Sequence, residues 1–89
     1  MAQLDTGVIS MQLSRAEEGL PEEQFRAGLL YSTGDEVPLD LVTAHKWFNL
    51  AAMNGVVEAR ECRAEISQDM SPEEIAAAQK QAREWYLSH

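Results

Sequence analysis

Few side chains in this chain are of the types that carry out chemistry, and none has a suitable partner close to it in the sequence. Cys62 is the one cysteine, and it falls on a predicted inward row of a helix with no base that could activate its thiol. His45 and His89 do not share the His-x-x-x-His spacing of metal ligands. Ser32 and Thr33 lack a His or Lys at a spacing that would make either hydroxyl a nucleophile. The sequence therefore predicts no catalytic, cofactor-binding or metal-binding residues, and no enzyme.

Four carboxylates lie around one predicted turn, at Glu17, Glu18, Glu22 and Glu23. Such a group could bind a cation or a patch of basic residues on a partner. Acidic residues are also favourable at the N-terminal end of a helix and in a solvated turn. We favour the second interpretation, because these residues flank a predicted helix boundary.

The composition limits the classes of partner. The chain has 89 residues, enough for one domain with a small core, and its seven Lys and Arg against fifteen Asp and Glu give a net charge of -8. This charge repels nucleic acid and anionic lipid, so we expect neither nucleic acid nor a membrane as partner. A protein or peptide with basic residues is the expected partner. The single cysteine and the absence of a leader-like N-terminal run predict a cytoplasmic protein.

Apolar periodicity and end signals predict an all-α chain of five helices. Gly19 and Gly34 suit the residue after a helix, while Asp40 and Ser71 suit the N-cap position before one. Ser71 is also followed by Pro and by Glu74, which completes a capping box. The expected ranges are about 6–18, 21–33, 41–54, 56–68 and 72–87, the first with Asp5 or Thr6 as its N-cap.

Part of this pattern occurs twice. Two sets of positions recur at offsets of 36 and 38 residues: Ala16 and Gly19 at Ala52 and Gly55, then Ala44, Trp47 and Phe48 at Ala82, Trp85 and Tyr86. Repeats of this length are typical of stacked helical hairpins. The four aromatic residues could form a ligand-stacking surface, but their helical spacing favours a place in the core.

A longer pattern runs from residue 26 to residue 59, where small residues, aromatics and glycines occupy particular positions on two successive predicted helices. The residues that carry it are Gly28, Tyr31, Gly34, Val37, Asp40, Ala44, Trp47, Phe48, Ala51, Ala52, Gly55 and Ala59. This run resembles a Sel1-like repeat, which is related to the tetratricopeptide repeat. Ala27, Glu36 and Glu23 depart from the family pattern, so the loop between the helices can follow a different path.

The resemblance implies a fold and a core. The implied fold is a short right-handed α-solenoid of antiparallel helical hairpins in one domain, residues 1–89. It would contain a half repeat at about 5–19, a clear repeat at about 20–55 and a degenerate repeat at about 56–88. The implied structural core residues of the repeat are Gly28, Tyr31, Gly34, Ala44, Trp47, Phe48, Ala51, Ala52, Gly55, Ala59, Ala82 and Trp85. Gly28 would let two helices approach closely, and alanines would make room for Tyr31 and Trp47.

The resemblance also implies a function, because family members are mostly adaptors or scaffolds in signalling, quality control and bacterial regulation. Such proteins bind a protein or peptide through the first helix of each repeat. The residues that would form this binding face are Gln24, Arg26, Leu29, Ser32, Thr33, Arg60 and Arg63. The alternative is self-assembly as a homodimer, with Trp85, Tyr86 and Leu87 of the last helix as the contact, because a short array buries little surface.

Overall fold

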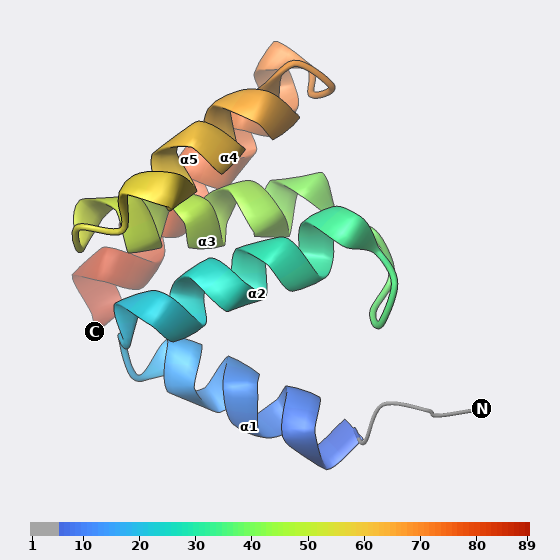
Figure 1. Cartoon of the computed structure of the whole chain (residues 1–89). Coiled ribbons are helices and arrows are strands. Elements are labelled where there is room, and N and C mark those ends of the chain that lie inside the picture. Colours follow the sequence, from blue (N-terminus) through green and yellow to red (C-terminus); the bar gives the residue numbers. More distant parts are fainter. Residues whose placement is uncertain (1–5) are drawn as a thin grey trace.

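The computed structural model describes residues 6–89, and within them the chain is all-helical with no β-strand. The five predicted helices are present, and each end lies within one residue of the predicted one. Their bounds are α1 Thr6–Glu17, α2 Pro21–Thr33, α3 Leu41–Met53, α4 Val57–Ser67 and α5 Pro72–Ser88 (Figure 1).

Local signals account for these ends. The Asp40 carboxylate accepts a hydrogen bond from the Thr43 N–H at 3.0 Å, which confirms the predicted N-cap of α3. Ser71 and Glu74 form the predicted capping box of α5, with each side chain accepting from the other residue's N–H. Gly34 follows α2 with a left-handed φ of 70°, as a C-terminal glycine should. The predicted cap of α1 by Asp5 or by the Thr6 side chain lies outside the described part of the chain.

Helix α3 is central to the arrangement. It packs against α2, α4 and α5, while α1 covers α2 on the side away from α4 (Figure 1). Helices α4 and α5 both pack on α3, but they are not among the closely packed helix pairs of residues 6–89. The antiparallel pairing that the repeat predicts for these two helices stays a prediction.

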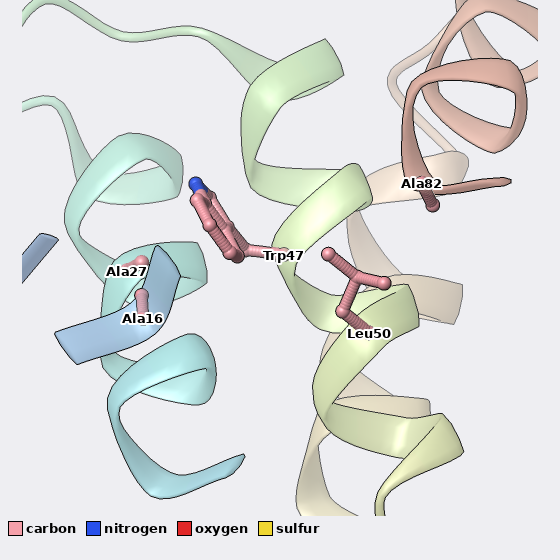
Figure 2. Close-up of a cluster of buried hydrophobic side chains, with 5 residues drawn as sticks. All are labelled: Ala16, Ala27, Trp47, Leu50 and Ala82. Atoms are coloured by element: carbon pink, nitrogen blue, oxygen red, sulfur yellow. The ribbon is translucent and has the colours of Figure 1, made fainter. Parts of the chain in front are cut away.

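The first of two core clusters lies on the side of α3 that faces α1, α2 and α5. Trp47 extends from α3 toward Ala16 of α1 and Ala27 of α2, and Leu50 lies between Trp47 and Ala82 of α5 (Figure 2). The three alanines are almost fully buried, so they let the other helices approach the large side chains of α3.

The second cluster joins α2, α3 and α4, and its largest buried member is Phe48, which has no exposed surface. The ring of Phe48 lies against the backbone of α2 at Gly28, where its Cδ1 and Cε1 atoms occupy the space that a Cβ would need. The predicted close approach of two helices at Gly28 is therefore confirmed.

The implied core residues divide into three groups by burial. Those buried are Gly28, Ala44, Trp47, Phe48, Ala51, Ala59 and Ala82. Those half-buried are Tyr31, Gly34, Ala52 and Trp85. Gly55 is exposed, so its inclusion in the core was wrong: it has a φ of 96° and serves the turn after α3.

A Gly28→Ala variant tests the α2–α3 contact. Alanine gains about 1 kcal/mol over glycine in a helix interior, but overpacking a well-filled core costs about 1–3 kcal/mol. Because Phe48 is fully enclosed and cannot retreat, we expect a net loss of about 1–2 kcal/mol in the free energy of unfolding, measured by urea denaturation. In a Phe48→Leu background, Gly28→Ala should lower the free energy of unfolding by less than it does in the wild type. A Gly28→Ala protein as stable as the wild type would contradict this packing.

Candidate functional site

Three of the predicted binding residues lie together in a groove between α1 and α2. This groove has a volume of about 250 Å³, and Arg26, Leu29 and Thr33 of α2 line it with Gln12 of α1 and Glu36 of the following loop. Among the side chains that line this groove, Leu29 is apolar and exposed to solvent. We call this hollow, which Leu30 also lines, the α1–α2 groove.

The hydroxyl groups of Ser32 and Thr33 donate hydrogen bonds to backbone carbonyls of their own helix, α2. The Ser32 hydroxyl donates to the Leu29 carbonyl at 3.1 Å, and the Thr33 hydroxyl donates to the Leu30 carbonyl at 3.3 Å. Each hydroxyl still has a lone pair with which to accept a hydrogen bond. Ser32 is half-buried and does not line the groove, so Thr33 is the better placed of the two.

Gln24 cannot serve as a binding residue as the sequence predicted, because its side chain has 0% exposure. Its amide nitrogen donates to the Ala16 carbonyl at 3.3 Å, and its amide oxygen accepts from Asn54 at 3.2 Å. The Gln24 amide therefore joins the C-terminal ends of α1 and α3. A buried amide without hydrogen-bond partners would destabilise the folded chain, and here both the nitrogen and the oxygen of the Gln24 amide are bonded.

The predicted residues on α4 do not join the others. Arg60 is exposed, and neither it nor Arg63 lines the α1–α2 groove. Arg63 is half-buried and turns toward α3, where one guanidinium nitrogen donates to the Asn49 Oδ1 at 2.6 Å. The prediction that Arg63 belongs to one binding face with Arg26 was therefore wrong, because Arg63 serves the α3–α4 contact.

Arg63 belongs to a polar network that the sequence did not reveal. The Ser67 hydroxyl donates to the Arg63 carbonyl at 2.7 Å, so its oxygen accepts from His45 Nε2 at 3.1 Å. His45 Nδ1 must then accept from the Asn49 amide nitrogen at 3.2 Å. His45 is therefore the neutral tautomer with its proton on Nε2. The Ser67 oxygen can only accept from this nitrogen, and the Asn49 amide nitrogen can only donate to Nδ1.

The surroundings of His45 oppose its protonation. Burial lowers the pKa of His45 below its ordinary value of 6.5, and the nearby Arg63 guanidinium lowers this pKa further. A second proton would also place an N–H on Nδ1 opposite the Asn49 amide donor. The ring is therefore a structural hydrogen-bonding group near neutral pH.

This network predicts a pH dependence of stability. Because the pKa of His45 is lower in the folded chain, the unfolded chain takes up the proton first as the pH falls below 6.5. We expect the free energy of unfolding to decrease from about pH 8 to about pH 5, measured by urea denaturation. His45→Gln should make this decrease smaller, because it removes the group whose pKa differs between the folded and unfolded chains. An unchanged pH dependence in His45→Gln would contradict the proposed role of the network.

The four carboxylates around the first turn are divided by their contacts. Glu17 accepts a hydrogen bond from the Trp85 indole at 2.6 Å. Glu23 lies between Arg15 and Arg26, at 3.7 Å and 3.8 Å. In residues 6–89, no group of three or more His, Cys, Asp or Glu side chains is placed to hold a metal ion. Glu17 and Glu23 thus take part in contacts between helices.

Cys62 is half-buried on α4 and packs at the edge of the second core cluster. Burial raises the pKa of its thiol, and the carboxylates of Glu65, Glu61 and Glu58 raise it further. Because the thiolate is the nucleophilic form, this environment makes Cys62 less reactive than a free cysteine.

A second surface lies at the C-terminal ends of α3 and α5. Met53, Tyr86 and Leu87 are exposed there by 60%, 53% and 80%, and we call these three residues the α3–α5 surface. Tyr86 was expected to be buried, which was wrong, because Trp85 fills the adjacent core position and turns Tyr86 outward. The sequence signal for this surface was the run of three large residues, Trp85 to Leu87, which one helix face cannot bury together.

Comparisons with known proteins do not assign the chain to a family, since neither a protein-family model nor a curated protein matches it. None of the helices in residues 6–89 combines the length and apolar character needed to cross a membrane. The resemblance to Sel1-like repeats therefore stays a prediction from the residues that carry it.

Proposed function

We propose that this chain is a non-catalytic protein-interaction module of the Sel1-like type, which binds a protein or peptide in the α1–α2 groove. The observation that carries the proposal is the meeting of Arg26, Leu29 and Thr33 in one hollow. The sequence predicts all three as part of one binding face, and α1 forms the opposite wall of the groove through Gln12. A cytoplasmic location is part of the proposal, because the one cysteine has no partner for a disulfide.

The stacking of repeats is supported by a contact between equivalent positions. Trp47 and Trp85 are separated by the 38-residue offset, and their rings meet edge to face with centroids 6.1 Å apart. Neighbouring units of a solenoid contact each other in this way, because each unit buries its apolar face only against the next. Trp47 and Trp85 would then be the matching positions of two successive units.

The groove suits a partner with both apolar and basic side chains. Leu29 offers an apolar contact, Thr33 an acceptor oxygen and Glu36 a carboxylate at the rim. Arg26 already faces Glu23 at 3.8 Å, so part of its charge is compensated within the chain. The net charge of -8 attracts a basic partner at longer range.

Substitution in the groove tests the binding site. Peptides would be selected from a random library on the wild-type protein, and their affinities measured by fluorescence anisotropy. We expect Leu29→Gln to weaken binding about 10-fold, because it removes an apolar contact while keeping the size and helix preference of the side chain. Val57→Gln on α4 is the matched control, since Val57 is 67% exposed and lies outside the groove. Equal binding by wild type and Leu29→Gln would refute this site.

Salt dependence tests the charge of the partner. If the chain attracts a basic peptide, its association rate should fall as salt rises from about 0.02 M to about 0.3 M, because the screening length shortens over this range. Stopped-flow fluorescence with a selected peptide measures the rate. A rate that does not change with salt would contradict electrostatic attraction, even if the groove residues prove correct.

A further inference from the structure

The α3–α5 surface joins exposed apolar side chains into a patch. Met53, Tyr86 and Leu87 all line one groove, which has a volume of about 340 Å³ and also borders Ala82. Single exposed apolar residues are ordinary on a protein, whereas neighbouring ones mark a place where another surface binds. Leu87 is the most exposed large apolar side chain of residues 7–89.

The charges on the two sides of this patch are opposite. Met53 and Tyr86 line a second groove of about 290 Å³, so they form the ridge between the two hollows. Arg83 lines the first hollow and Glu18 lines the second. Neither Arg83 nor Glu18 forms an ion pair with another residue in the described part of the chain. The surface thus has an apolar centre, an unpaired cation on one side and an unpaired anion on the other.

This distribution of charge is complementary to itself. In a two-fold symmetric interface, a contact from one residue to another is repeated in the opposite direction. We propose that the α3–α5 surface binds a second copy of this chain, with the two-fold axis passing near Met53 and Tyr86. Arg83 of each copy then faces Glu18 of the other copy, and the apolar side chains of both copies pack at the centre.

Other occupants fit this surface less well. A strongly basic peptide, as proposed for the α1–α2 groove, would meet the unpaired charge of Arg83. A uniformly acidic partner surface would meet the unpaired carboxylate of Glu18 on the other side of the patch. A second copy satisfies both sides at once, and the repulsion between the two net charges is screened over about 8 Å at physiological ionic strength. The dimer interface is separate from the α1–α2 groove, so this inference goes beyond the proposed function.

The test is the mass in solution as a function of concentration at about 0.15 M salt, measured by sedimentation and by light scattering. The mass should rise from 9.9 kDa toward twice that value. We expect Leu87→Gln to weaken dimerisation about 10-fold or more, because it removes a central apolar contact. Val57→Gln is again the control and should leave the dimer unchanged. A constant mass of 9.9 kDa at all concentrations, or a dimer unaffected by Leu87→Gln, would overturn the proposal.

A charge exchange tests the symmetry directly. Arg83→Glu should weaken the dimer about 10-fold by placing two carboxylates together, and adding Glu18→Arg should restore it by pairing the exchanged charges. Failure of the double variant to recover would overturn the two-fold pairing. Each variant should give the wild-type circular dichroism spectrum and retain peptide binding in the α1–α2 groove. Conversely, Leu29→Gln should leave the dimer intact, so the two proposals can be refuted independently.

Discussion

The close contact of α2 with α3 at Gly28 is the constraint on which the rest of the structure depends. The Phe48 ring takes the space beside Gly28, so the backbones of α2 and α3 approach more closely than two side chains would allow. Consecutive helical residues point about 100° apart, so Trp47 then faces α1 and α5 while Phe48 faces α2 and α4. A single helix thereby supplies the large side chains of both core clusters. The positions of α4 and α5 follow from the surfaces that α3 presents to them, while α1 covers α2 and places Ala16 near Trp47.

Central placement has a consequence for the polar residues of α3. His45 and Asn49 are buried between α3 and α4, where an unbonded polar atom would destabilise the fold. The hydrogen bonds with Ser67 and Arg63 satisfy them in a single order of donors and acceptors. A shift of α4 along α3 by one turn would break the two bonds that join these helices, His45 to Ser67 and Arg63 to Asn49. The network therefore fixes the register of two helices whose apolar contacts alone are mostly with small residues.

Much of the fold could be predicted from the sequence, because its signals are local. Gly34, Asp40 and Ser71 act on the helix ends next to them, and apolar spacing within one helix shows which side is inward. The hydrogen bonds of buried polar residues, by contrast, join positions that are far apart in the sequence. His45 bonds to a residue 22 positions away, and Gln24 bonds to Asn54 at a separation of 30. Nothing in the local sequence of either residue indicates such a partner.

The same distinction explains the outcome for the candidate site. Arg26, Leu29 and Thr33 share one face of α2, so their proximity follows from helical geometry. Whether Arg63 joined them depended on how α4 packs against α3, which the half-polar pattern of α4 did not determine. Tyr86 was misplaced because Trp85 takes the core position of α5, and the next residue of a helix points about 100° away from it.

The contact between α1 and α5 affects how these terminal helices can unfold locally. The Trp85 indole donates to Glu17 across 68 residues of sequence, and its ring also lies beside Gly19. In an open row of stacked units the terminal units fray first, since each has a neighbour on one side only. Here α1 cannot leave without exposing Trp85, and α5 cannot leave without exposing Trp47. The two ends are therefore linked through the two tryptophans, because removal of either end helix would uncover an aromatic ring that it helps to shield.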